Sequence, residues 1–503
     1  MDADKGALKK LHYVCRGCNL RAMGGCEGDR CLAYMTDPDK RRRLLTEPMN
    51  TQYDGVRFTS DAMDCSLPIS MDSHSGCSFG CLYCFSNNLN RATDRNPDKM
   101  RHLVEGKRLN LYGEWAVERL AKFLNRELEN PVARAMYALL DQRLPIQLGT
   151  LGDPFDDLEE VSGWMKRAVP LFAEHRQPVR ISTKGARVMM LKAYRDLFGQ
   201  YDPAQFWFAF SIITADDAKL EAVDVAAPNA TARLKAMKAY SAAGHPVSLR
   251  FRPFLFGISD YHKRAPKGEG WKVLLDKAAE AGAQAVSFEF VFLNSALTTR
   301  QKIMYHHMFQ IQDNPRFGEW WNSHSNLKES CRRASRNLKF DITMAVRERV
   351  HALGMTFGIS DPHFKEYNDT GSCCGIQPND PWFGNYSRRQ LTQVIVDLHR
   401  AHEQGQPLRV TYRDWAPEWA HAVEAHEMIA QGNWKGYRSR KGQTFGDVMR
   451  NKWNAPRHPR SPYVYFKGTM TPVGKDPQSG DLVYEYRKWH PDFDKQFKGI
   501  PNK

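Results

Sequence analysis

The chain has 503 residues, of which 42% are hydrophobic, and a formal net charge of +15. No stretch approaches the roughly 18 apolar residues of a membrane-spanning helix, and the first ten residues, MDADKGALKK, lack the apolar core of a secretion signal. We therefore expect a cytoplasmic protein with no membrane partner. The excess of positive charge favours a polyanionic partner, although many basic enzymes have none.

The first 66 residues are predicted to form a Cys-rich N-terminal segment. Four of the chain's cysteines, Cys15, Cys18, Cys26 and Cys31, lie close together within it. In a reducing compartment, such clusters are typical of metal ligation rather than of disulfides. Four thiolates match the ligand count of a structural zinc ion and equally of a second [4Fe–4S] cluster. Both alternatives stay open.

From residue 67 onward, short apolar runs alternate with amphipathic stretches. Strands are predicted at 67–71, 146–150, 179–183, 206–212, 247–254 and 285–292. Helices are predicted at 113–129, 158–174, 186–198, 231–243 and 270–281, and a further helix and strand at 341–353 and 356–360. This alternation predicts the α/β class and, over residues 67–365, a partial (β/α)6 TIM-type barrel.

A cysteine motif follows the first of these strands. Cys77, Cys81 and Cys84 have the spacing C-x3-C-x2-C, and Tyr83 directly precedes the third cysteine. Three thiolates this close suit three corners of an iron–sulfur cubane and leave its fourth iron open. A zinc site with His74 as fourth ligand is the alternative, but zinc usually binds two separated pairs of ligands. The position after a strand, where barrel enzymes place their chemistry, favours the cluster.

This motif resembles that of the radical S-adenosylmethionine (SAM) superfamily. In that superfamily SAM binds the open iron of the [4Fe–4S] cluster, and reduction of the cluster yields a 5′-deoxyadenosyl radical. Three further segments resemble the branch that contains the spore photoproduct lyases, namely LGTLGDPFDDLE at 148–159, VRISTKGARV at 179–188, and residues 208–247. The resemblance covers about residues 67–260. It implies the cluster, SAM and an electron donor such as flavodoxin or ferredoxin.

Four residues match positions that bind the cofactors in this branch. The resemblance implies that Tyr83 packs near the adenine or the cluster, and that Asp153 lies near the SAM amino group. It also implies that Lys184 pairs with the SAM carboxylate and that Ser211 contacts the ribose or the carboxylate. Gly152 stands where the branch has threonine. The last three of the four assigned residues fall at the predicted carboxyl ends of strands, which is the active face of such barrels.

One departure from the branch concerns the reaction. The lyases use a cysteine beyond the cluster loop as a hydrogen-atom donor, whereas this chain has no cysteine between Cys84 and Cys331. Only Cys331, Cys373 and Cys374 remain as donors that the fold could bring to the site. We therefore expect modification or rearrangement of a base rather than lesion repair.

Residues 366–503 are predicted to form an irregular, basic C-terminal extension rich in aromatic residues. Within it, residues 431–475 hold ten Lys and Arg residues against one acidic residue, Asp447. Cations neutralise phosphates and aromatic rings stack on exposed bases, so this composition favours contact with nucleic acid over a solvated basic surface. The candidate contact residues are Trp434, Arg438, Arg440, Lys441 and Trp453.

Together these patterns predict a radical SAM enzyme that modifies or rearranges a nucleobase in nucleic acid. A substituent of a hypermodified thymidine is one example of such a substrate. One alternative is a radical SAM enzyme for a small molecule or peptide. The other is a metal-stabilised nucleic-acid-binding module without catalytic activity.

Overall fold

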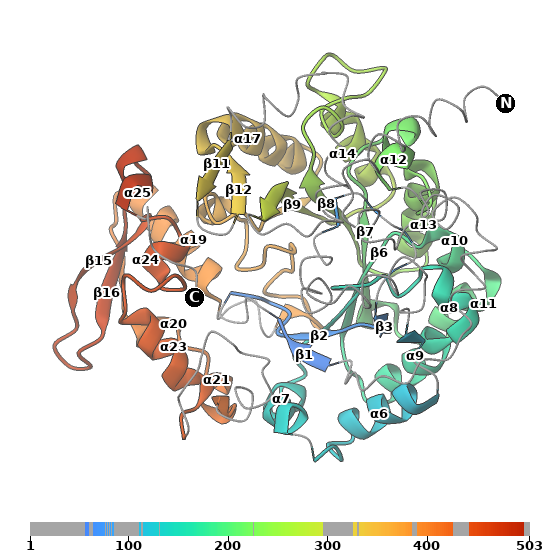
Figure 1. The fold of residues 1–503 in the computed structure, drawn as a ribbon, viewed down its shortest axis with the longest axis horizontal. Coiled ribbons are helices and arrows are strands. Elements are labelled where there is room, and N and C mark those ends of the chain that lie inside the picture. Colours follow the sequence, from blue (N-terminus) through green and yellow to red (C-terminus); the bar gives the residue numbers. More distant parts are fainter. Residues whose placement is uncertain are drawn as a thin grey trace, which may run out of the picture.

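The computed structural model describes residues 56–59, 64–75, 77, 79, 81, 83–84, 110–111, 114–129, 131–224, 226–294, 325–328, 331–384, 390–425 and 442–496. Its centre is an eight-stranded sheet with the order β1-β2-β5-β6-β7-β8-β9-β13 (Figure 1). The strands are β1 (Val56–Phe58), β2 (Ile69–Met71), β5 (Ile146–Leu148), β6 (Val179–Thr183), β7 (Phe206–Ser211), β8 (Val247–Phe254), β9 (Ala285–Phe290) and β13 (Thr356–Ile359).

All strands of this sheet except β1 run parallel to their neighbours, and β1 pairs antiparallel with β2. Their residues are buried almost throughout, and all six residues of β7 (FWFAFS) are inaccessible to solvent. Strands with both faces covered have nearly continuous apolar sequences, which is why they could be found in the sequence. The predicted α/β class and the parallel sheet of a partial TIM-type barrel are therefore confirmed.

Helices connect successive strands and cover the outer face of the sheet (Figure 1). They are α6 (Glu114–Leu124), α7 (Pro131–Asp141), α8 (Asp157–Ser162), α9 (Trp164–Glu174), α10 (Ala186–Met189), α11 (Lys192–Phe198), α12 (Asp217–Val223), α13 (Ala230–Ala242), α14 (Gly270–Glu280) and α17 (Arg336–Ala352), with 3-10 turns η3 (Pro203–Gln205) and η4 (Lys365–Tyr367). The single helix predicted at 158–174 is divided between α8 and α9. The division lies at Gly163, which has a left-handed φ of 57° that glycine adopts without strain.

Shorter strands form two additional small sheets beside the barrel. β3 (His74–Ser75) pairs with β4 (Asn110–Leu111), and a three-stranded sheet contains β10 (Phe292–Asn294), β12 (Cys331–Ala334) and β11 (Ser325–Lys328). β10 follows β9 almost directly, so this second sheet extends from the carboxyl end of a barrel strand.

The C-terminal region consists of short elements around an aromatic core. They are α19 (Leu391–Glu403), β14 (Arg409–Val410), α20 (Tyr412–Trp415), α21 (Trp419–Ala422), α23 (Phe445–Trp453), α24 (Pro462–Tyr465), β15 (Met470–Lys475), β16 (Leu482–Tyr486) and α25 (Pro491–Gln496). The rings of Trp415 and Trp453 stack with their centroids 5.4 Å apart. The irregular sequence pattern thus reflects elements too short to show a clear period.

This region packs directly against the start of the barrel. Phe58 of β1 contacts Phe445 of α23, with ring centroids 6.0 Å apart. The buried carboxylate of Asp64 accepts hydrogen bonds from Thr392 Oγ1 at 2.5 Å and Tyr465 Oη at 2.7 Å, and it pairs with Lys365. One continuous apolar core therefore extends from the barrel into the C-terminal elements.

None of the helices in the described ranges is long and apolar enough to cross a membrane.

Candidate active site

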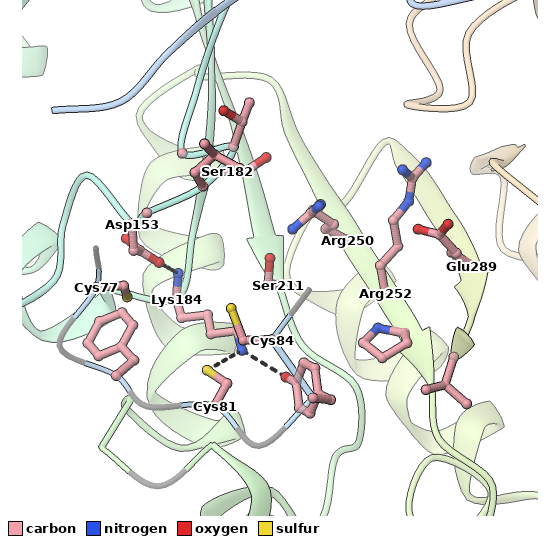
Figure 2. A pocket seen from close by; sticks show the side chains of 18 of the residues that line it. Cys77, Cys81, Cys84, Asp153, Ser182, Lys184, Ser211, Arg250, Arg252 and Glu289 are labelled. Carbon is pink, nitrogen blue, oxygen red and sulfur yellow. Dashed lines mark hydrogen bonds between the residues drawn. The ribbon is translucent and has the colours of Figure 1, made fainter. Parts of the chain in front are cut away.

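A cavity of about 120 Å³ opens at the carboxyl ends of the parallel strands. It is bounded by the cysteine loop (residues 77–84), by residues 149–153 after β5, and by the ends of β6, β7, β8 and β9. Figure 2 shows the cysteine loop on one side of this cavity and the side chains of β8 and β9 on the other. In parallel α/β folds this edge of the sheet is where ligands bind.

The three thiols of the cysteine loop all line this cavity. Cys81 is buried, while Cys77 and Cys84 are half-buried. In the part of the chain that the structure describes, no three His, Cys, Asp or Glu side chains converge on one metal ion. A cubane binds each thiolate to a different iron, so three thiols that face one cavity suit a cluster better than a single ion. No histidine and no fourth cysteine is found among the described lining residues.

Lys184 directly follows β6, and its ammonium group lies against the cysteine loop. Its Nζ donates to Cys81 Sγ at 2.9 Å and to Tyr83 Oη at 2.7 Å (Figure 2). It also donates to Asp224 Oδ1 at 2.8 Å. Burial raises the pKa of Cys81 to about 12, in opposition to the nearby Lys184 charge. Burial also disfavours the Lys184 cation, but Asp224, Cys81 and Tyr83 together outweigh this effect and raise the pKa of Lys184. The ammonium therefore stays charged and has all three of its protons engaged.

Asp224 is the shared counter-ion behind Lys184. Its Oδ2 accepts a hydrogen bond from Arg233 Nη1 at 2.7 Å, and both side chains of this second pair are fully buried. Burial works against the carboxylate, yet Lys184 and Arg233 together lower the pKa of Asp224. Arg233 also donates to the backbone oxygen of Ser211 at 2.8 Å, which fixes the end of β7. The buried hydroxyl-bearing side chain of Ser211 lines the cavity.

Asp153 is held in place from three directions. It accepts hydrogen bonds from Thr183 Oγ1 at 2.7 Å, from the backbone N–H of Lys184 at 2.6 Å and from that of Phe155 at 3.0 Å. Burial raises its pKa to about 6, although the hydrogen bonds oppose this shift. A buried carboxylate at a cavity wall is suited to binding a ligand cation.

The loop from Gly149 to Gly152 is positioned by Asp72, which directly follows β2. The Asp72 carboxylate accepts backbone N–H bonds from Thr150 at 2.9 Å, Leu151 at 2.9 Å and Gly152 at 3.1 Å. At Gly149 φ is +74°, and a Cβ atom there would lie 2.2 Å from the Ser182 backbone oxygen. Sequence reasoning missed Asp72, although an acidic residue just after a buried strand is a signal that could have been used.

The structure thus brings Tyr83, Asp153, Lys184 and Ser211 together with the cysteine loop around one cavity. Sequence reasoning missed five charged residues of this region. They are Asp224 and Arg233 behind Lys184, and Arg250, Arg252 and Glu289 on the opposite wall.

Other predicted site residues lie elsewhere. Cys15, Cys18, Cys26 and Cys31, as well as Trp434, Arg438, Arg440 and Lys441, are outside the described residues. Trp453 is described and is 0% exposed, and its Nε1 donates to the Leu482 backbone oxygen at 2.7 Å. No base can stack on a ring in this position, so the prediction for Trp453 does not hold; the residue belongs to the aromatic core.

Cys373 and Cys374 are not among the described residues that line the cavity, but the backbone oxygen of Cys373 contacts Arg252, which does line it. The Cys373 oxygen accepts from Arg252 Nη2 at 2.6 Å and from Ser287 Oγ at 2.9 Å. The two cysteines pack beside Cys65 in a small cluster near the amino ends of the strands.

Comparisons with known proteins give a limited set of relatives. No family model matches the chain. An uncharacterized protein of Mycobacterium bovis and two of Mycobacterium tuberculosis are each 27% identical to it over 262 residues, which is 49% of this chain and 69% of the relative. Among solved structures, a spore photoproduct lyase complexed with dinucleoside spore photoproduct is 12% identical. It covers 59% of this chain and 78% of its own, with a TM-score of 0.41. A cysteine-to-serine variant of this lyase covers 61% and 79%, at 12% identity and a TM-score of 0.41.

Proposed function

We propose that the chain is a radical SAM enzyme, with a [4Fe–4S] cluster on the three cysteines of the cysteine loop and SAM in the adjoining cavity. One observation carries this proposal. The three thiols share a single cavity with Asp153, Lys184 and Ser211, at the carboxyl ends of a parallel sheet. When bound, the cluster and SAM supply a 5′-deoxyadenosyl radical that takes a hydrogen atom from a substrate carbon.

The residues of the cavity have separate tasks in this proposal. Lys184 stabilises the thiolate of Cys81 through a charge-assisted hydrogen bond, which also fixes Tyr83. Lys184 would hold the SAM carboxylate with the ammonium group that pairs with Asp224. Asp153 accepts from the SAM amino group, and Ser211 bonds the ribose or the carboxylate.

The substrate in this proposal is a nucleobase, or a base substituent, in nucleic acid. The composition of residues 431–475 and the motif resemblance support this choice. Among the described residues that line the cavity, the only cysteines are the three proposed cluster ligands, and this supports modification or rearrangement of the base over repair. An electron donor such as flavodoxin or ferredoxin is the expected protein partner, and the N-terminal cysteines are proposed to bind zinc or a second cluster.

Cysteine variants test the cofactor assignment. Cys77→Ala, Cys81→Ala and Cys84→Ala, each reconstituted anaerobically with iron and sulfide, should lose the visible iron–sulfur absorbance and form no 5′-deoxyadenosine from SAM after reduction. Cys65→Ser, which changes a thiol outside the cavity, should retain both properties. Cleavage of SAM by any of the three alanine variants at the parental rate would contradict the assignment.

The parental preparation tests the remaining parts of the proposal. Iron well above about four atoms per chain indicates a second cluster, and one zinc per chain indicates a zinc site. Mass spectrometry of nucleosides from DNA incubated with reduced enzyme and SAM should reveal an altered base. Unaltered nucleosides alongside 5′-deoxyadenosine formation would remove nucleic acid as the substrate and leave the radical SAM assignment intact.

A further inference from the structure

The wall of the cavity opposite the cysteine loop carries two arginines on β8. Arg250 and Arg252 are separated by one residue, so their side chains leave the same face of the strand, and both line the cavity. Figure 2 shows Arg250 pointing toward Ser211, across the cavity from Cys81 and Lys184. Arg250 also stands directly beside Ser211 in the pairing of β7 with β8.

The two guanidinium groups differ in how they are held. Arg252 Nη2 donates to the Cys373 backbone oxygen at 2.6 Å, whereas its buried Nε has no hydrogen-bond partner in the described structure. The guanidinium group of Arg250 forms no hydrogen bond and no ion pair with any residue that the structure describes. Glu289 lines the same wall, but it stands beyond ion-pair distance of both arginines. Arg250 is therefore a half-buried cation at the cavity wall, and its guanidinium has no direct partner among the described residues.

The surroundings of Arg250 are positively charged overall. Arg180 lies on the inner face of β6 and is almost fully buried; its Nη1 donates to two neutral groups, Gln147 Oε1 at 2.8 Å and Ser182 Oγ at 3.2 Å. Burial, together with the charges of Arg252 and Arg180, lowers the pKa of Arg250 to about 10. Glu289 and Cys374 act on the pKa of Arg250 in the opposite direction, but they do not outweigh burial and the two neighbouring arginines. A desolvated cation without a counter-ion is costly, and an anionic ligand removes that cost.

We propose that Arg250 and Arg252 form an anion-binding subsite for the substrate and that the group they bind is a nucleotide phosphate. This proposal rests on the nucleic-acid substrate proposed above. A guanidinium group presents parallel N–H donors that match phosphate oxygens, which a single ammonium does not. Phe292, a half-buried residue, also lines the cavity, and the guanidinium of Arg333 lies over its ring at 4.6 Å from the centroid. A phosphate bound at this wall places the attached nucleoside between the arginines and the cysteine loop.

The first test uses inorganic phosphate, so that it does not depend on the nucleic-acid substrate. Phosphate at about ten times its dissociation constant should raise the melting temperature of the reconstituted parent by roughly 2 °C over chloride of equal ionic strength. Arg250→Gln should lose this rise. Arg195→Gln, which removes an exposed arginine on α11, should keep it. An equal rise in Arg250→Gln would mean that phosphate binds elsewhere and would overturn the subsite.

Acetate in place of phosphate tests for a carboxylate site, and a rise with acetate alone would overturn the phosphate assignment.

The second test uses a labelled single-stranded pentanucleotide of mixed sequence and its neutral methylphosphonate analogue, compared by fluorescence anisotropy. The parent should bind the charged strand at least about tenfold more tightly than the neutral one, and Arg250→Gln should lose most of this difference. Arg250→Lys keeps the charge without the planar donors and should fall between the two. The dissociation constant of SAM, measured separately, should stay within about twofold of the parental value in Arg250→Gln.

The outcomes separate the two proposals. A loss of SAM affinity in Arg250→Gln, with unchanged DNA affinity, would assign Arg250 to the SAM carboxylate and overturn the substrate subsite. If the parent binds phosphate through Arg250 but binds neither pentanucleotide, the anion subsite stands and the nucleotide part of the proposal is wrong.

Discussion

Asp153 shows how a single buried residue prepares the cavity for a cation. Its carboxylate is 7% exposed, and burial raises its pKa to about 6 from an ordinary value of 3.8. Because the folded-state pKa is the higher one, the folded protein binds the proton more tightly than the unfolded chain does. The stability contributed by Asp153 is therefore largest below about pH 4, falls as the pH rises to about 6, and stays lower at neutral pH by about 3 kcal/mol. A bound ammonium group would stabilise the ionised carboxylate and so offset this loss of folding stability.

We therefore predict that SAM affinity depends on pH through Asp153. Below pH 6 the protonated carboxyl cannot pair with the SAM amino group, so the dissociation constant should rise about tenfold between pH 7 and pH 5. Asp153→Asn should bind SAM weakly and show little change over this range. Asp157→Asn, at the start of α8, is the matched control and should keep the parental pH dependence. Equilibrium dialysis with labelled SAM provides the measurement, and a flat parental profile would exclude this role for Asp153.

The cavity residues that could be predicted from the sequence share one property. Asp153 and Lys184 follow buried strands and Ser211 ends one, and the carboxyl ends of parallel strands meet at one edge of the sheet. The partners of these residues could not be predicted. Asp224 reaches Lys184 from 40 residues away and follows a helix, so only the tertiary fold brings the two together. Arg250 lies inside a strand, where its direction depends on the register of the sheet.

At the scale of elements, burial explains which predictions held. The parallel strands were found because they are covered on both faces, so that nearly all of their residues are buried and apolar residues recur along them. The ends of the helices were harder to predict than the strands, since they depend on local capping residues. α17 begins at Arg336 rather than near 341, because the Ser335 side chain caps it by accepting from the Leu338 N–H at 3.4 Å. The first turn of α17 is mostly polar, so the sequence shows no periodic apolar pattern there that would reveal where the helix begins.

α17 is tied to the loop after β13 by a buried ion pair, which gives a prediction about stability. Lys339 Nζ donates to Asp361 Oδ2 at 2.5 Å and to His363 Nδ1 at 3.1 Å, and the lysine is 0% exposed. Burial lowers the pKa of His363 to about 3, so this imidazole is neutral and can accept. Lys339→Met should lower the free energy of unfolding by about 3–5 kcal/mol, because it leaves the buried Asp361 charge uncompensated.

Urea unfolding measures this effect, and Lys339→Met/Asp361→Asn should recover part of the loss. Lys272→Met removes an exposed lysine that pairs with Glu269 at 2.8 Å, and should cost less than about 1 kcal/mol. A Lys339→Met variant as stable as the Lys272→Met control would show that the pair does not hold α17 in place.

At the scale of the whole molecule, the C-terminal region and the barrel share one core. Asp64 bonds Thr392 and Tyr465, and Phe58 packs on Phe445, so the first strand of the sheet is held by the last third of the chain. Because aromatic residues build this shared core, the aromatic content of residues 431–475 is not by itself a sign of stacking on bases. The described rings of Phe445, Trp453 and Phe466 are buried and serve packing. The cations of this segment, rather than these rings, are left as the candidates for contact with nucleic acid.

The last prediction therefore concerns charge alone. Reversal of Arg438, Arg440 and Lys441 to Glu should weaken binding of single-stranded DNA by a similar factor for every sequence, because phosphate contacts do not distinguish bases. Each lost contact should reduce the slope of log affinity against log salt by about 0.7, and three should reduce it by roughly 2. Reversal of Arg195, Lys235 and Lys238, which are exposed on α11 and α13, makes the same change in net charge at another place. If both triple variants lose the same slope, the effect is due to net charge. If only the first does, residues 438–441 contact the phosphates. Unchanged slopes in both would favour a small-molecule or peptide substrate held in the cavity.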